Sequence, residues 1–191
     1  MFNLSTYQLI NLSTFKLFKL LNSKKMNTAI IYATTHGTTE KVALKIKELA
    51  GPENTFLFNL KDGLPFDLDA FDKIIIGGSI HAGMIQKRVK DFCKQHTLEL
   101  LQKPLGLYLC GMNEPEYEVQ MAKNFPEILR RHATAMDTLG GEFLFDKMNF
   151  FQKLIVKKVS GISESVHKLN DEKIQNFTNN LKNIETKNPV L

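Results

Sequence analysis

The chain has 191 residues, of which 43% are hydrophobic, and this length and composition are ordinary for one globular domain. The formal net charge is +5, but residues 1–25 carry four lysines and no acid, so the rest of the chain keeps only +1. A nearly neutral body argues against general nucleic-acid binding, and the separate Cys93 and Cys110 argue against a disulfide framework or a CxxC zinc site.

Residues 1–25 differ from the rest of the chain. They nearly repeat "NLSTYQLI" as "NLSTFKLF", and lysines interrupt the apolar positions. A secretory signal needs an unbroken apolar core, so the alternatives are a transit peptide, a short amphipathic membrane anchor, translated upstream sequence or a disordered tail. Met26 stands directly before the first expected strand and favours the last two. We therefore expect an N-terminal extension over 1–25, one domain over 26–185 and a C-terminal tail over 186–191.

From Asn27 onward, short apolar runs alternate with helical patterns. Strands are predicted at the apolar or β-branched runs, at residues 28–33, 55–60, 73–77, 105–110 and 133–145. Helices are predicted where apolar residues recur every three or four positions, at residues 39–50, 85–101, 147–159 and from Asn170 onward. The last strand would break at Gly140-Gly141, and residues 111–132 are irregular or helical. This alternation predicts an α/β fold with a parallel sheet.

Three loops would leave the carboxyl ends of these strands, at 34–39, 78–84 and 111–118, and ligands bind at that edge of a parallel sheet. The first loop, "TTHGTT", has four threonines and a glycine directly before a helix, whose unpaired N–H groups attract phosphate. The chain lacks both GxxxxGK(S/T) and GxGxxG at this place. A phosphate monoester held by amides and hydroxyls therefore fits better than a nucleoside triphosphate. The alternative is a threonine-rich turn that only caps the helix.

The second loop, "GGSIHAGM" at 77–84, contains three glycines. Glycines allow the backbone to approach a flat ligand and to reorient its peptide groups. An ordinary strand-to-helix turn is the alternative, but two such loops after the first and third strands favour a ligand site.

The residues of these loops resemble those of a known family. "YATTHGTTEKVA" resembles the phosphate-binding segment of flavodoxins, where an (S/T)xTGxT pattern wraps the phosphate of FMN. Thr34, Gly37 and Thr39 match that pattern, and His36 stands where flavodoxins usually have threonine.

Two further segments are similar to one branch of that family, the menaquinone-dependent protoporphyrinogen oxidases. "IIIGGSIHAGMIQKRVKDFCKQH" contains the IGxSIxxG pattern of the branch, at Ile76, Gly77, Ser79, Ile80 and Gly83. "LGGEFLFDKMNFFQKLIVKKVSG" is similar to the tail of the branch. The resemblance covers roughly residues 27–182.

The resemblance implies a flavodoxin-like doubly wound five-stranded parallel sheet, in the order 2-1-3-4-5, with helices on both faces. It also implies FMN as the cofactor. The residues expected at the cofactor are Thr34, Thr35, His36, Gly37, Thr38, Thr39, Ser79, Ile80, His81, Ala82, Gly83, Cys110, Gly111, Met112 and Asn113.

The sequence identifies no catalytic acid or base and no metal-binding cluster. His81 is the best candidate for contact with flavin or substrate, since the second loop has no aromatic residue to stack on the flavin. Cys110 is expected either to approach the flavin or to be a buried, inert thiol. His36 is expected to point outward or to touch the phosphate through its backbone N–H.

Two main roles remain open. As an enzyme, the chain would pass electrons from a reduced organic substrate to a quinone, and the branch resemblance implies protoporphyrinogen IX and menaquinone, in haem biosynthesis. As an electron carrier, it would dock to redox partner proteins. Such carriers usually have strongly acidic surfaces, and the only acidic patch near the expected site is Glu114, Glu116 and Glu118. A third reading is an FMN-binding domain without robust activity, or a nitrogen- or stress-related quinone reductase.

The expected location is the cytoplasm, with a peripheral contact at the inner face of the cell membrane as an option. The helix over 147–159 combines Phe150, Phe151 and Leu154 with several lysines. Basic amphipathic helices bind anionic membranes, where a quinone is reached. The alternative is a helix packed on the core with a solvated basic side.

Overall fold

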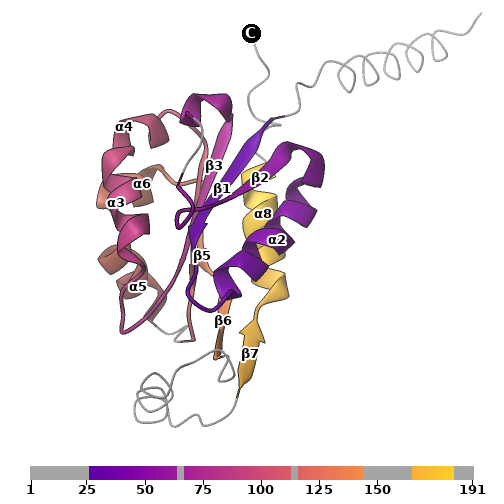
Figure 1. Cartoon of the computed structure of the whole chain (residues 1–191), viewed down its shortest axis with the longest axis vertical. Coiled ribbons are helices and arrows are strands. Elements are labelled where there is room, and N and C mark those ends of the chain that lie inside the picture. Colours follow the sequence, from indigo (N-terminus) through magenta and orange to yellow (C-terminus); the bar gives the residue numbers. More distant parts are fainter. Residues whose placement is uncertain (1–25, 64–66, 113–115, 144–164, 183–191) are drawn as a thin grey trace, which may run out of the picture.

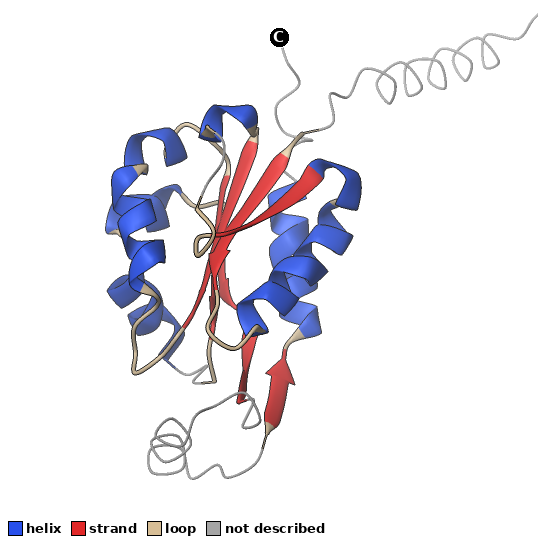
Figure 2. Ribbon diagram, in the orientation of Figure 1, coloured by secondary structure: helices blue, strands red, loops and turns tan. Residues whose placement is uncertain are grey.

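A computed structural model of the chain describes residues 26–63, 67–112, 116–143 and 165–182. A parallel sheet forms the centre of the molecule and helices cover both of its faces (Figures 1 and 2). Its strands, in spatial order, are β2 (Thr55–Asn59), β1 (Thr28–Ala33), β3 (Lys73–Ser79), β4 (Leu105–Cys110) and β5 (Ala135–Thr138). The expected order 2-1-3-4-5 is therefore confirmed.

The three central strands are buried along their whole length, which explains their almost continuous apolar sequences. Successive residues of a strand point to opposite faces, so each strand contributes to two cores. Ile31, for example, packs in the core on one face, whereas its neighbour Ile30 packs with Ile75 in the core on the other. This double covering fixes the register of the sheet, because a shift by one residue would exchange the two faces.

Two groups of helices cover the sheet (Figure 1). One face carries α2 (Thr38–Ala50) and α8 (Asp171–Lys182). The other face carries α3 (Lys87–Gln95), α4 (Thr97–Leu100), α5 (Tyr117–Asn124) and α6 (Glu127–His132). Two short 3₁₀ helices, η1 (Pro52–Asn54) and η2 (Leu68–Ala70), precede β2 and β3. Asn170 caps α8 as its sequence suggests, since its Oδ1 accepts a hydrogen bond from Lys173 N at 3.0 Å.

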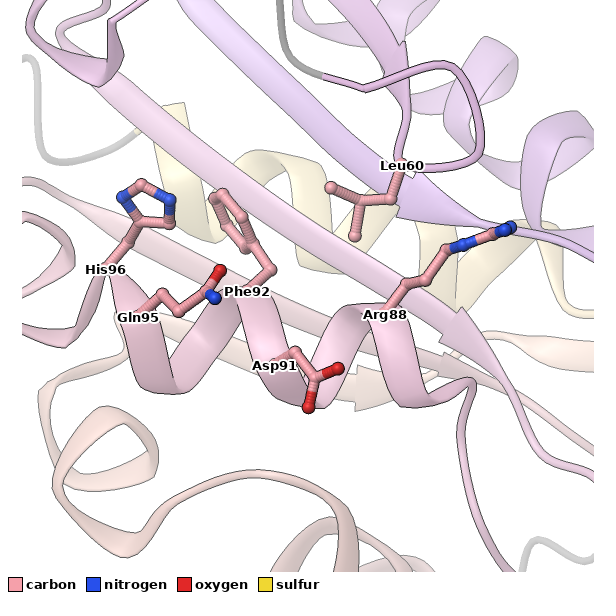
Figure 3. Close-up of a pocket in the computed structure, with 6 residues that line it drawn as sticks. All are labelled: Leu60, Arg88, Asp91, Phe92, Gln95 and His96. Carbon is pink, nitrogen blue, oxygen red and sulfur yellow. The ribbon is translucent and has the colours of Figure 1, made fainter.

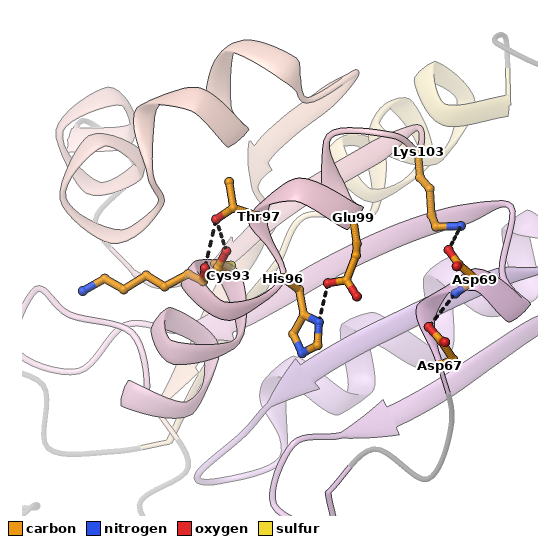
Figure 4. Close-up of polar contacts among 8 residues, drawn as sticks. Asp67, Asp69, Cys93, His96, Thr97, Glu99 and Lys103 are labelled. Atoms are coloured by element: carbon orange, nitrogen blue, oxygen red, sulfur yellow. Dashed lines mark hydrogen bonds and ion pairs between the residues drawn. The ribbon is translucent and has the colours of Figure 1, made fainter.

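The single helix predicted over 85–101 is wrong, because α3 and α4 are separate helices. The Thr97 hydroxyl donates to the carbonyl oxygens of Cys93, at 2.7 Å, and Lys94, at 3.2 Å (Figure 4). Such side-chain bonds compete with regular helical bonding. His96 leaves helical geometry between the two helices, with φ −105° and ψ 20°, and its Nδ1 lies 2.6 Å from Glu99 Oε2.

The strand predicted over 133–145 breaks at Gly140, as its sequence indicates. Gly140 has a φ of 83°, which favours glycine, and the chain turns there from β5 into β6 (Gly140–Phe143). β6 leaves the parallel sheet and pairs antiparallel with β7 (Val166–Leu169), a strand that the sequence did not predict. Figure 2 shows this pair beyond the carboxyl edge of the main sheet.

Three expectations lie outside the described residues: the extension over 1–25, the helix over 147–159 and the tail over 186–191. Among the residues that are described, no helix is long and apolar enough to cross a membrane.

Candidate cofactor site at the carboxyl edge of the sheet

The three loops predicted to bind a ligand leave the same edge of the sheet. β1, β3 and β4 are parallel neighbours, and their last residues pair as Ala33 with Gly78 and Ser79 with Cys110. The hydrogen bond from Ile80 N to Cys110 O, at 2.8 Å, continues this pairing into the loops. The sheet therefore brings together segments that are more than 30 residues apart in the sequence.

The first loop ends in an uncapped helix N-terminus. Gly37 is the N-cap of α2, with a φ of 94° and no side-chain cap, and its N–H donates to Thr34 Oγ1 at 2.9 Å. The first helical hydrogen bond runs from Lys41 N to Gly37 O. The amides of the first turn come before that bond and have no acceptor inside the helix, so they and the helix dipole form a site suited to an anion.

Thr39 supplies a second sign of a ligand at this turn. Its side chain is completely buried, and its hydroxyl makes no hydrogen bond with any of the described residues. An unsatisfied buried hydroxyl is costly, so such a group is suited to a ligand oxygen. Burial raises the pKa of the Cys110 thiol and the nearby Thr39 hydroxyl offsets part of that rise, but a thiol is only a weak hydrogen-bond partner.

Gln86 joins the first two loops and was missed by the sequence analysis. Its Oε1 accepts from Ser79 N at 3.2 Å, and its Nε2 donates to Ser79 Oγ at 2.6 Å and to Thr35 Oγ1 at 3.3 Å. Ser79 Oγ also lies 3.1 Å from His81 Nε2. In the sequence, Gln86 is marked only by its position directly before α3. Its contacts with Ser79 and Thr35 depend on the folded arrangement of the two loops.

The second loop closes as a tight turn. His81 N donates to Met84 O at 2.9 Å, and Met84 N donates to His81 O at 3.1 Å. Ala82 and Gly83, between them, have φ values of 50° and 79°. Positive φ is unusual for alanine, and such strain concentrates at functional sites.

Asn124, another residue that the sequence analysis missed, supports this turn from α5. It is 3% exposed, its Oδ1 accepts from Ile85 N at 2.9 Å, and its Nδ2 donates to Gly83 O at 3.2 Å. No pattern in the sequence indicates this role.

Two histidines connect the first and second loops at the surface. The rings of His36 and His81 meet edge to face, with centroids 5.7 Å apart, so His36 does not simply point into solvent. Partial burial of the His81 ring lowers its pKa below 6.5, and the charge of His36 lowers the pKa further. His81 is therefore neutral at neutral pH and able to accept a proton.

The residues expected at the cofactor fall into two groups. Thr34 to Thr39, Ser79 to Gly83, Gly111 and the half-buried Met112 lie in the loops at this edge. The Cys110 side chain instead packs in the core below α2 and is 2% exposed, and burial raises the pKa of its thiol to about 12. This supports the buried-thiol alternative. Asn113 and Glu114 lie outside the described residues.

A shallow pocket of about 370 Å³ lies elsewhere on the molecule (Figure 3). It is lined by Leu60, Arg88, Asp91, Phe92, Gln95 and His96. None of these residues belongs to the three loops, so the pocket is not the expected cofactor site. Within the described ranges there is also no group of three or more His, Cys, Asp or Glu side chains that could hold a metal ion.

Comparisons with known proteins address the family to which the chain belongs. The family model described as "Flavodoxin domain" matches residues 29–170. A protoporphyrinogen IX dehydrogenase (quinone) of Leishmania major is 22% identical over 151 residues, which cover 73% of this chain and 65% of that protein. Flavodoxin 2 of Salmonella typhi is 38% identical over 52 residues, 27% of this chain and 30% of that protein. The chain thus spans less than two thirds of either relative.

Solved structures agree on the fold. A flavodoxin from the domain Archaea has a TM-score of 0.54 and 15% identity, covering 85% of this chain and 98% of its own. Oxidised flavodoxin 1 from Bacillus cereus has a TM-score of 0.52 and 16% identity, covering 82% of this chain and 97% of its own. From the match of the family model and the shared sheet order, we conclude that the chain belongs to the flavodoxin family, whose cofactor is FMN.

Proposed function

We propose that this chain binds FMN at the carboxyl edge of its sheet and oxidises protoporphyrinogen IX, with menaquinone as the electron acceptor. The observation that carries the proposal is the uncapped first turn of α2, which combines amides that have no acceptor within the helix with the Thr39 hydroxyl, which makes no hydrogen bond to a described residue. A phosphate monoester satisfies both. The 34–39 loop contains no lysine or arginine, so the amides, the helix dipole and the hydroxyls hold the phosphate.

The residues of the second loop orient the reacting partners. When bound, FMN supplies an acceptor for two electrons and a proton. Gln86 fixes both the backbone and the hydroxyl of Ser79, and Ser79 in turn contacts the His81 ring. Because His81 is neutral at neutral pH, its ring can accept a proton released as the substrate is oxidised.

Similarity and charge support a porphyrinogen substrate. The Leishmania major relative is named for this reaction. Two ammonium groups also lie at the rim of the second loop: Lys90 Nζ is 3.5 Å from Met84 Sδ and 3.4 Å from Lys123 O, and Lys123 Nζ is near Gly83. Cations at this rim would attract the carboxylates of a porphyrinogen. Peripheral contact with the inner face of the cell membrane through residues 147–159, where menaquinone is reached, is part of the proposal.

A soluble electron carrier is the second candidate function. It is favoured by the similarity to flavodoxin 2 and by the start of α5, where Glu116 and Glu118 are exposed beside Val119, which is 64% exposed. An apolar residue among acids suits docking to a basic redox protein.

The test is anaerobic oxidation of protoporphyrinogen IX with menaquinone as the acceptor, using the full chain and a form that starts at Met26. We expect yellow protein that releases FMN on denaturation, forms protoporphyrin and reduces menaquinone. Reoxidation by a protein partner alone would instead support the carrier. Protein that takes up no FMN would contradict both functions.

A further inference from the structure

Glu142 of β6 places a carboxylate at the same helix turn that is suited to phosphate. The Thr38 hydroxyl donates to Glu142 Oε2 at 3.3 Å, and Lys41 Nζ lies 3.0 Å from Oε2 and 3.1 Å from Oε1. The Glu142 side chain is only 3% exposed. Burial raises the pKa of the Cys110 thiol, and the negative charge of Glu142 raises it further.

A carboxylate is itself an anion that a helix N-terminus stabilises. Gly37 gives α2 no side-chain cap, and within the described part of the chain the anion bonded to the Thr38 hydroxyl comes from β6, about 100 residues later in the chain. Glu142 is therefore well placed in the protein without FMN, where Lys41 balances its charge. A phosphate that enters the same turn brings at least one further negative charge, and the 34–39 loop adds no cation.

We propose that the Glu142 carboxylate is an internal anion that competes with the FMN phosphate for the first turn of α2. This inference rests on the proposed FMN site. The same helix dipole would stabilise both anions, the Thr38 hydroxyl is bonded to Glu142, and two negative charges at one helix turn repel each other. Glu142 thus lowers the affinity for FMN while it stabilises the protein that has no cofactor.

The decisive variant is Glu142→Gln, which keeps the size of the side chain and an oxygen for Thr38 but removes the charge. We expect the Kd for FMN, measured by quenching of flavin fluorescence, to fall about tenfold. Riboflavin, which has no phosphate, should bind the variant and the wild type equally.

A matched control is Glu48→Gln. Glu48 is exposed on the same helix, ten residues after Thr38, so this variant loses the same charge away from the turn. Its Kd for FMN should change by less than about twofold, because exposed charges at this distance are screened by salt.

Thermal unfolding gives a second readout. Without FMN, Glu142→Gln should have a lower Tm than the wild type, because the helix N-terminus loses an acid and Lys41 loses its partner. Saturating FMN should raise the Tm of the variant by more than it raises that of the wild type, since a tighter ligand stabilises more. Glu142→Ala provides the same comparison if Glu142→Gln does not fold.

The outcomes separate this inference from the proposed function. Unchanged or weaker FMN binding by a folded variant overturns the inference and leaves the FMN site in place. An equal gain in affinity for FMN and for riboflavin also overturns the inference, because Glu142 would then act on the part of the site that holds the flavin ring and not on the phosphate. Wild-type protein that binds no FMN overturns the proposed function, and the inference with it.

Discussion

The ring of Tyr108 fills the space that a side chain at Gly77 would need. The two residues are partners in β3 and β4, and a Cβ added to Gly77 would lie 2.0 Å from Tyr108 Cζ. The Tyr108 hydroxyl, which is completely buried, donates to Thr39 O at 3.1 Å. The first glycine of "GGSIHAGM" thus makes room for a tyrosine that holds the first turn of α2, a different reason from the approach to a flat ligand that the sequence suggested.

Gly77→Ala should therefore lower the free energy of unfolding by about 3 kcal/mol, because the added methyl group overlaps the Tyr108 ring. Denaturation by urea measures this loss. In the double variant Gly77→Ala/Tyr108→Ala the two losses should not add, because removal of the ring frees the space for the methyl group. Additive losses would show that the two side chains do not compete for space.

Thr39→Val should affect stability and cofactor binding in opposite directions. Removing the unsatisfied hydroxyl should raise the free energy of unfolding of the FMN-free protein by about 1 kcal/mol. The phosphate would lose a hydroxyl donor, so the Kd for FMN should rise about tenfold. Urea denaturation and flavin titration measure the two effects.

Thr178→Val is the control for that variant. Thr178 is also buried, but its hydroxyl donates to Ile174 O at 2.8 Å in α8. This variant should lose stability and bind FMN normally. A loss of stability in Thr39→Val would mean that its hydroxyl has a partner after all.

Thr34→Ala should weaken FMN binding far more than His36→Ala. Thr34 accepts the Gly37 N–H and thereby shapes the turn that presents the amides, whereas the His36 ring packs edge to face against His81. Fluorescence titration of both variants gives the ranking. The reverse order would overturn our account of the 34–39 loop.

Gln86→Leu should weaken the connection between the loop at 34–39 and the loop at 78–84. It removes the bonds to Ser79 and Thr35, so we expect a loss of about 1–2 kcal/mol in the free energy of unfolding together with weaker FMN binding. The matched control is Gln95→Leu, at an exposed position of α3, the helix that Gln86 precedes. Equal effects of the two variants on the Kd would exclude a specific role for Gln86.

The stability of the protein should fall on acidification in a way that depends on His81. Its pKa is below 6.5 in the folded state, so the unfolded state takes up the proton first as the pH falls. The contribution of His81 to the free energy of unfolding is therefore present above pH 6.5 and is lost as the pH falls below that value. Between pH 8 and pH 5, the Tm of the wild type should therefore fall more than that of His81→Gln. Equal falls in Tm would show that folding does not perturb the His81 ring.

The sequence predicted best those features that depend on local burial. The strands 28–33 and 105–110 match β1 and β4 because both are buried on each face and so are continuously apolar. The sequence did not predict β7, because its residues "VHKL" form a strand through antiparallel pairing with β6 and show no strand pattern of their own.

For the candidate site, the sequence indicated which loops share an edge of the sheet but not the contacts between them. The threonine loop and the glycine loop are local patterns, and the sheet order brings them together. Gln86, Asn124 and Glu142 were missed because each acts through a contact with a distant element, such as that of Glu142 with Lys41 across 101 residues. A single sequence contains no signal for such pairs.

The turn at Gly140 also affects how the molecule meets other chains. β5 is an edge strand of the parallel sheet, and it has only four residues because the chain leaves the sheet at Gly140. A short edge offers few unpaired backbone groups to which a strand of another molecule could add, and this protects against aggregation. The residues that would have lengthened that edge are paired with β7 instead. One glycine thus limits how much open strand edge this protein presents to its neighbours.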